Sequence, residues 1–249
     1  MNCTMKKGLA LVAVTALASV AWANAELQPI EEEAPARSDV SFHKSYGWTA
    51  VALGLATPVQ IPWGIDKWDV FGLDLNLGYS DAPKMYGLEI ALGGNVARKT
   101  MIGMQVAVGF NFSNTNSYGA AVSLFNMNNE KFYGLSIDAF GRNRNVYGVE
   151  VNLLGAMTDQ TMGGLTINGI ASAVDGDVYG LQASLVANFA RRLNGLQLAV
   201  VYNQTSMLWG GQIGLVNMAT ECDHGFQLGL INIIMDNQWP VLPIINWYY

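Results

Sequence analysis

The sequence predicts an all-β protein, and three features of the chain lead to this prediction: a glycine-led repeat, an alternation of residue types within it, and polar clusters between its copies. The repeat occurs eleven times between residues 72 and 225, at intervals of 14 to 16 residues. Its glycines are Gly72, Gly87, Gly103, Gly119, Gly134, Gly148, Gly164, Gly180, Gly195, Gly211 and Gly225.

The alternation is clearest in the copy that covers residues 102–112. Large apolar side chains form one set, namely Ile102, Met104, Val106, Val108, Phe110 and Phe112, and small or polar residues form the other, namely Gly103, Gln105, Ala107, Gly109 and Asn111. A period of two is what a strand with two different faces produces. Polar clusters such as Arg98-Lys99 and Thr158-Asp159 separate the copies, as turns do.

The N-terminal 45 residues differ from the rest of the chain. Lys6 and Lys7 precede an apolar run over residues 9–23 that ends in small residues, which predicts a cleaved signal peptide over residues 1–25. A short membrane anchor is the alternative, but the run is shorter than the span of about 20 residues that a bilayer requires. Residues 26–45, rich in glutamate, predict a flexible acidic leader, and residues 46–249 a single repeat-built β-domain.

Charge and cysteine content narrow the possible partners. The formal net charge is −6, and cleavage after Ala25 would remove Lys6 and Lys7 and make it −8. An acidic chain is a poor partner for nucleic acid, which requires clustered Lys and Arg. Cleavage would also leave Cys222 as the single cysteine, so no intramolecular disulfide is expected.

Composition favours a membrane β-barrel. Hydrophobic residues make up 51% of the chain and charged residues only 13%, where about a quarter is usual in soluble domains. No later segment is as long and apolar as a membrane helix, but alternating strands of nine to eleven residues are typical of barrels. We therefore expect an antiparallel, up-and-down membrane β-barrel of about 12 to 14 strands, closed so that it has no exposed edge.

A β-solenoid with one 14- to 16-residue repeat per coil is the alternative. Exact repetition of a single unit favours it, as do asparagines that could stack into a ladder: Asn95, Asn111, Asn126, Asn188, Asn203, Asn217 and Asn232. Eleven straight residues would reach roughly 36 Å, and the four or five left in each repeat could not return that distance. A solenoid therefore requires each strand to bend sharply in its middle, for example at Gly93-Gly94 or Gly109.

The barrel prediction assigns roles to two sets of residues. Polar side chains two residues after the repeat glycine would line the lumen: Asp74, Glu89, Gln105, Ser136, Glu150, Thr166, Gln182, Gln197 and Gln227. Tyrosines just before the glycine would form aromatic girdles at the two membrane surfaces: Tyr86, Tyr118, Tyr133, Tyr147 and Tyr179. The lumen would be a hydrated bore, or would be closed by water or by residues 26–45.

Three late copies carry a recognisable motif: Gly195-Leu-Gln-Leu-Ala-Val-Val-Tyr-Asn203, Gly211-Gln-Ile-Gly-Leu-Val-Asn217 and Gly225-Phe-Gln-Leu-Gly-Leu-Ile-Asn232. With the ending Pro240-Val-Leu-Pro-Ile-Ile-Asn246, they resemble a bacterial family of surface-repeat proteins built from tandem Gly-Leu-Gln-Ile-Gly-Leu-Val-Asn units. The resemblance covers about residues 58 to 246. It implies an exported, envelope-associated protein whose biochemical role is not established.

The sequence predicts no catalytic, cofactor or metal site, because the chain holds only His43 and His224. His224 lies beside Glu221, Cys222 and Asp223, but charged residues normally collect in turns, and no second ligand cluster accompanies them. The leading expectation is an outer-membrane or cell-surface barrel that contacts the lipid bilayer, either as a narrow passive channel for small solutes or as a structural component. The alternative is a secreted β-solenoid that serves as an adhesion or interaction scaffold.

Overall fold

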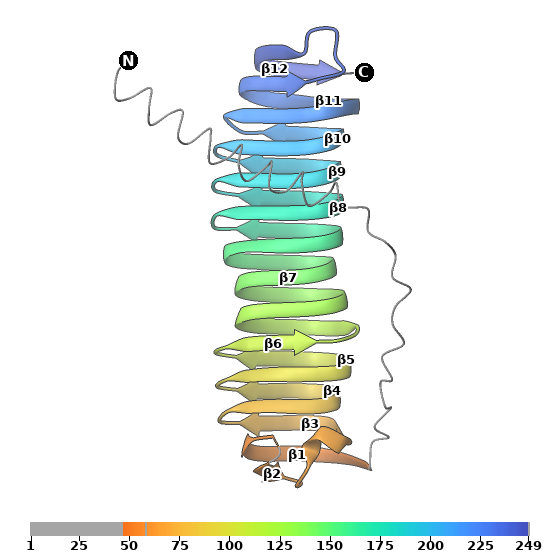
Figure 1. Cartoon of the computed structure of the whole chain (residues 1–249), viewed down its shortest axis with the longest axis vertical. Coiled ribbons are helices and arrows are strands. Elements are labelled where there is room, and N and C mark those ends of the chain that lie inside the picture. Colours follow the sequence, from red (N-terminus) through yellow and green to blue (C-terminus); the bar gives the residue numbers. More distant parts are fainter. Residues whose placement is uncertain (1–46, 58, 249) are drawn as a thin grey trace, which may run out of the picture. The chain divides into compact units, whose positions relative to one another are not determined.

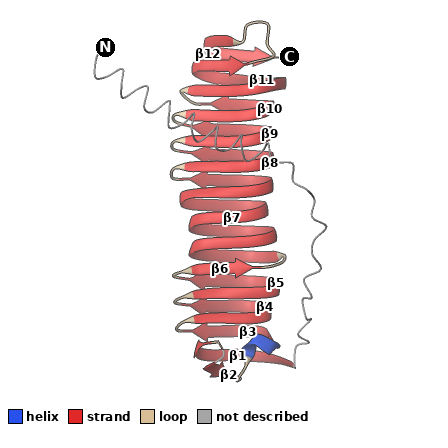
Figure 2. Cartoon of the chain, viewed as in Figure 1, coloured by secondary structure: helices blue, strands red, loops and turns tan. Residues whose placement is uncertain are grey.

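The structure, a computed structural model, describes residues 47–57 and 59–248, which form a β-solenoid rather than a barrel (Figures 1 and 2). The predicted signal peptide and acidic leader lie outside the described residues. Each repeat makes one coil, and the repeat glycines of neighbouring coils are paired, for example Gly72 with Gly87 and Gly87 with Gly103. Each coil is named below by its repeat glycine.

The strands are β1 (Gly47–Ala56), β2 (Val59–Ile61), β3 (Trp68–Asn76), β4 (Tyr79–Ala91), β5 (Gly94–Ala107), β6 (Phe110–Ser113), β7 (Ser117–Asn168), β8 (Ala171–Ser184), β9 (Ala187–Ala199), β10 (Tyr202–Ile213), β11 (Val216–Ile234) and β12 (Val241–Tyr248). One short 3₁₀ helix, η1 (Ile65–Lys67), precedes β3. Within the described residues, no helix is long and apolar enough to cross a membrane.

The pairing of the strands shows that the prediction of an antiparallel barrel is wrong. Neighbouring coils pair in parallel, as β4 does with β5 and β9 with β10. Antiparallel pairing occurs only at the two ends of the stack, where β2 pairs with β1 and β12 with β11. These end strands cover coil edges that would otherwise be open to pairing with another chain.

The physical reason for the wrong prediction is that the repeat strands are not straight. The chain bends at residues 92–93 and again at residues 108–109, where the solenoid alternative requires it to fold. At the first bend the Gly93 N–H donates to the carbonyl of Gly78 in the coil before, with N and O 2.7 Å apart. Each coil can therefore close within 14 to 16 residues.

The interior of the stack contains two kinds of side chain. Apolar residues form three buried groups, and in one of them Met162, Val178, Leu193 and Leu208 pack together. Polar side chains, mostly Asn, Gln, Ser and Asp, fill the rest of the interior. The larger aliphatic side chains of the repeat point outward and are exposed to solvent.

Candidate interaction face

The structure buries all nine side chains that the barrel prediction assigned to a lumen: Asp74, Glu89, Gln105, Ser136, Glu150, Thr166, Gln182, Gln197 and Gln227. They point into the solenoid, where some of them contact one another across neighbouring coils, as Gln105 Nε2 does by donating to Glu89 Oε2 at 2.7 Å. Three successive hydrogen bonds join Gln182, Gln197, Gln212 and Gln227, each from Nε2 to the Oε1 of the preceding glutamine, with N and O 2.8, 2.8 and 2.7 Å apart. The hydrated bore expected for a barrel is replaced by this packed amide ladder.

Gln212 belongs to this ladder but was missing from the predicted set. The sequence pattern predicts Gly211 as the repeat glycine, whereas in the structure Gly210 pairs with both Gly195 and Gly225. Counting 15 residues from Gly195, instead of 16, would have placed Gln212 two residues after its glycine. Because Gly210 and Gly211 are adjacent, the sequence alone does not show which of them is the repeat glycine.

A second ladder is formed by asparagines on the other side of the interior. Asn188, Asn203 and Asn217 each donate from Nδ2 to the Oδ1 of the next asparagine, the last acceptor being Asn232, with N and O 3.0, 2.9 and 2.8 Å apart. The same Nδ2 atoms also donate to backbone carbonyls, as Asn203 does to Ile213 at 2.8 Å. Both amide ladders therefore tie the coils of Gly180, Gly195, Gly210 and Gly225 together from within.

Replacing Gln197 by Leu is expected to destabilise the solenoid by about 2 to 4 kcal/mol, because it removes the acceptor of Gln212 and the donor to Gln182 at buried positions. Urea unfolding followed by circular dichroism measures the change. Gln238→Leu, at an exposed position, is the matched control and should change stability by less than about 0.5 kcal/mol. Equal effects of the two variants would contradict a stabilising ladder.

Four buried carboxyl groups interrupt the amide rows. Burial raises the pKa of Glu89 to about 8, and the nearby carboxyl of Asp74 adds to the rise. Burial, with a contribution from Asp138, raises the pKa of Glu150 to about 7. Burial also raises the pKa of Asp138 to about 6 and that of Asp74 above its usual value. Of these groups, Glu89 is therefore mainly protonated at neutral pH, and Glu150 is close to its midpoint.

The five predicted girdle tyrosines lie in one column instead of alternating between two membrane surfaces. Parallel coils place the residue before each repeat glycine at the same position, and Tyr118, Tyr133 and Tyr147 stack with ring centroids 5.1 and 5.0 Å apart. Tyr86 stacks on Phe71, and Tyr179 occupies the same position in its own coil. The prediction that these tyrosines form two girdles is therefore wrong, because it depended on strands that alternate in direction.

A continuous apolar face runs along the stack. It consists of the residues one, three and five positions after each repeat glycine, such as Leu88, Ile90 and Leu92 in the coil of Gly87, and we call it the apolar face. Most of these residues are Leu, Ile or Val. The fifth-position Leu and Val side chains are 45% to 73% exposed. No other element of the described chain covers them.

A groove lies in the middle of the apolar face. Its volume is about 770 Å³, and it extends from Ile137 to Ile213 between the third- and fifth-position columns. Gly169 occupies the fifth position there and has no side chain, while Leu153 and Leu185 border the gap in the neighbouring coils. A Cβ at Gly169 would lie 1.9 Å from the carbonyl oxygen of Leu153, so the backbone itself keeps this position empty.

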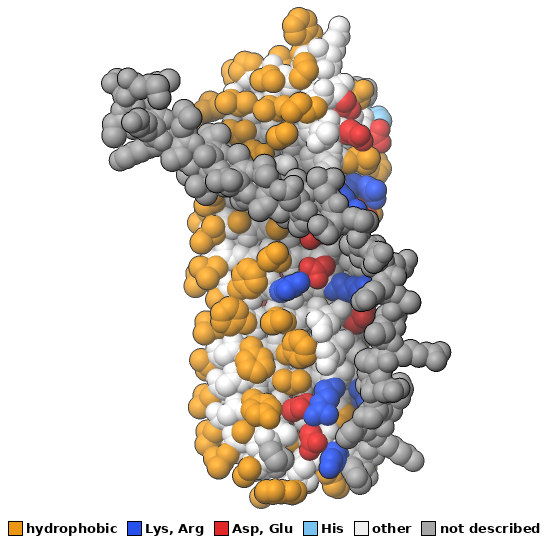
Figure 3. Space-filling model, in the orientation of Figure 1, with side chains coloured by type: hydrophobic (Ala, Val, Ile, Leu, Met, Phe, Trp, Pro, Cys, Tyr) orange, Lys and Arg blue, Asp and Glu red, His pale blue; other side chains and the backbone are white. Residues whose placement is uncertain are grey.

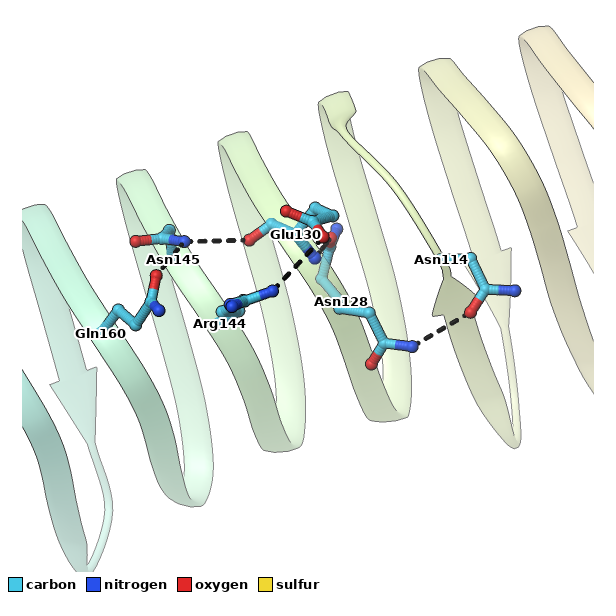
Figure 4. A network of polar contacts seen from close by, with 7 residues as sticks. Asn114, Asn128, Glu130, Arg144, Asn145 and Gln160 are labelled. Atoms are coloured by element: carbon cyan, nitrogen blue, oxygen red, sulfur yellow. Dashed lines mark hydrogen bonds and ion pairs between the residues drawn. The ribbon is translucent and has the colours of Figure 1, made fainter. Parts of the chain in front are cut away.

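Charged residues gather on another side of the stack, which we call the charged edge. Figure 3 shows hydrophobic side chains along one long edge of the visible surface and Lys, Arg, Asp and Glu toward the other. Ion pairs join neighbouring coils there, such as Arg98 with Asp81 and Arg192 with Asp177. Figure 4 shows the same kind of link between Glu130 and Arg144, with Oε1 and Nη1 3.4 Å apart.

The residues around His224 do not assemble a site. His224 occupies the register position of Trp209 on the coil before, and Cys222 is buried in the apolar core group. Burial, together with Asp236 and Asp223, raises the pKa of the Cys222 thiol to about 11, which makes it a poor nucleophile. The described part of the chain holds no group of three or more His, Cys, Asp or Glu side chains placed to bind a metal.

The apolar face is therefore the feature of the described chain that most needs an explanation. Its groove crosses the coils from Gly134 to Gly210, and the amide ladders join the last three of these coils from within. Comparison with known proteins gives no relative to guide its assignment: no family model, curated protein or solved structure matches this chain.

Proposed function

We propose that this chain is an exported, non-catalytic interaction scaffold that docks through its apolar face. The supporting observation is the set of mainly aliphatic columns along eleven coils, interrupted by Gly or Ala at a few positions, with no element of the described chain over them. Coils spaced about 4.8 Å apart and five residues of strand give a face of roughly 50 Å by 15 Å, or about 750 Å². The largest apolar patch on a typical monomer is about 300 to 600 Å².

The interior favours a scaffold over a channel. Amide ladders and apolar clusters occupy the space inside the coils, so the polar residues stabilise the stack instead of lining a path for solutes. The predicted signal peptide over residues 1–25 would deliver the chain to the cell surface, where a rigid stack can present a long flat face to a partner.

This function is tested by measuring whether the apolar face is shielded from solvent in the exported protein on cells. Leu153→Cys and Leu185→Cys place thiols on the face, and Ser206→Cys places one at an exposed position near the charged edge. We expect a membrane-impermeant maleimide added to exporting cells to label the two face cysteines at least about tenfold more slowly than Ser206→Cys, because a bound partner shields them. Mass spectrometry measures the labelling.

The wild-type chain is a low-background control, because its Cys222 is buried and has a raised pKa. Each variant is labelled again after unfolding in urea, which shows that every thiol can react. Equal labelling of the face and edge cysteines on cells would contradict docking through the apolar face.

A further inference from the structure

Resting on the proposed docking function, we infer that the occupant of the apolar face is a second copy of this chain. The two copies pack with their apolar faces together and are related by a two-fold axis. This axis is parallel to the strands and passes between the coils of Gly164 and Gly180. Their stacks then point in opposite directions, and each column meets the same column of the other copy. Such an interface is self-complementary: a residue i contacts j, and j contacts i.

The groove fixes the place of the axis. It extends from Ile137, in the coil of Gly134, to Ile213, in the coil of Gly210, so its midpoint lies between the coils of Gly164 and Gly180. A two-fold axis at this midpoint places Leu185 of each copy over the empty position at Gly169 of the other. An axis through the coil of Gly164 itself would instead place glycine opposite glycine and leave the gap unfilled.

The size pattern of the face agrees with this axis. In the eight coils from Gly119 to Gly225 that the axis superposes, five face positions carry Gly or Ala: Ala120, Ala139, Gly169, Ala183 and Gly211. The residues that the axis places opposite them are, in the same order, Phe226, Leu215, Leu185, Ile167 and Leu135. Each small residue thus lies opposite a large one, which is how two apolar surfaces interdigitate without voids. Gly211 alone is already covered within its own chain, by Phe226 and Leu196.

The area of contact is sufficient for a stable dimer. Eight coils at about 4.8 Å give roughly 40 Å of contact length, and the three columns with their side chains give roughly 15 to 20 Å of width. Each copy would then bury about 600 to 800 Å², or about 1,200 to 1,600 Å² in total. Specific, stable interfaces bury about 1,200 to 2,000 Å².

Charge favours a second copy over a lipid surface. Residues 47–248 contain 14 Asp and Glu against nine Lys and Arg. The basic side chains that border the stack include Arg98, Arg144 and Arg192, which pair with acidic neighbours on the charged edge. A protein that lies on an anionic bilayer needs basic residues beside its apolar face. A second copy requires only a matching apolar surface.

Sedimentation of the purified mature chain, residues 26–249, tests the dimer. We expect the wild type to be dimeric at micromolar concentration. The double variant Leu153→Glu/Leu185→Glu should associate at least about 100-fold more weakly, since two central contacts become charged. Ser206→Glu/Thr220→Glu, at exposed positions off the face, is the matched control and should stay dimeric. Circular dichroism and urea unfolding verify that all three chains are folded.

Cross-linking tests the axis. Phe125 and Ile231 are exposed and lie six residues after Gly119 and Gly225, one position beyond the apolar face, in coils that the axis places opposite each other. Chains carrying Phe125→Cys and Ile231→Cys, both with Cys222→Ala, should cross-link when mixed with a short bis-maleimide. Ile231→Cys alone should give no cross-linked dimer. Efficient cross-linking of Ile231→Cys alone would overturn the antiparallel arrangement.

The outcomes separate this inference from the scaffold function. A wild type that is monomeric at all concentrations, while its face cysteines are still protected on cells, overturns the dimer and leaves the scaffold with another partner, such as a bilayer or a different protein. A monomeric wild type whose face cysteines also react freely on cells overturns both. A dimer that persists in Leu153→Glu/Leu185→Glu places the interface elsewhere and overturns the inference.

Discussion

Gly210→Ala is expected to destabilise the solenoid by about 3 kcal/mol or more, whereas Gly211→Ala should change the free energy of unfolding by less than about 1 kcal/mol. Gly210 has φ 135°, a conformation that alanine rarely adopts. A Cβ on it would lie 2.0 Å from the carbonyl oxygen of Gly195 in the coil before. The coils of Gly195 and Gly210 would have to move apart, which would strain the hydrogen bonds between their parallel strands.

The adjacent Gly211 is a close control, because it is in the same coil and receives the same substitution. Its φ is not in the positive range, and a Cβ there would meet only the side-chain ends of Phe226 and Leu196, at 2.8 and 2.9 Å. Those ends can shift by rotation about their own bonds. The midpoint of urea unfolding by circular dichroism, measured at one fixed protein concentration, gives both values.

The reverse ranking, with Gly211→Ala the more harmful, would contradict the register of the last coils. It would also restore Gly211 as the repeat glycine and remove Gln212 from the amide ladder. The comparison thus tests the feature on which the interior of this region depends: close contact between successive glycine backbones, from which any side chain is excluded.

The strands of this fold could be predicted from the sequence, because alternation is local. A period of two around Gly103 is sufficient to place Gln105 and Met104 on opposite sides of a strand. The direction of the next strand is not local, and it decides between barrel and solenoid. Turns in both architectures use similar residues, so the bends within the repeats, such as those at residues 92–93, 108–109 and 185–186, distinguish them, and alternation does not reveal a bend.

The position of the polar residues also admitted two interpretations. Large aliphatic side chains outside and amides inside are what a membrane barrel requires. The solenoid places the same residues in the same way for another reason: Gln182, Gln197 and Gln212 satisfy one another's hydrogen bonds in a buried interior. The apolar face was therefore visible in the sequence, but its groove at Gly169 depends on which coils are neighbours.

Glu89→Gln is expected to raise the stability of the solenoid at pH 9 by roughly 3 to 5 kcal/mol and to leave it nearly unchanged at pH 4. The Glu89 carboxyl is fully buried, and its pKa is raised from 4.5 to about 8, chiefly by burial. Gln105 Nε2 donates to Glu89 Oε2 at 2.7 Å, while Oε1 accepts no hydrogen bond. A glutamine has the same shape, keeps the acceptor for Gln105 and carries no charge.

The direction of the pH dependence follows from proton binding. Below pH 4.5 the carboxyl is protonated in both the folded and the unfolded chain, so it adds no pH dependence. Between pH 4.5 and about 8 the folded chain keeps a proton that the unfolded chain has lost, and stability therefore falls as the pH rises. Above about pH 8 the loss is complete. The Glu89→Gln variant does not lose stability in this way, because the glutamine side chain does not titrate.

Glu150→Gln should behave in the same way over a narrower range, since the pKa of Glu150 is raised to about 7. Glu130→Gln is the control, because Glu130 is exposed and its pair with Arg144 lies on the charged edge, where such pairs contribute less than about 1 kcal/mol. Urea unfolding at pH 4, 6, 7.5 and 9 provides the comparison. If Glu89→Gln and the wild type lost stability in parallel from pH 4.5 to 8, the buried carboxyl of Glu89 would not be the cause. The interior otherwise holds amide, hydroxyl and apolar side chains, so the other buried carboxyls with a raised pKa, Glu150, Asp138 and Asp74, would be the next to replace.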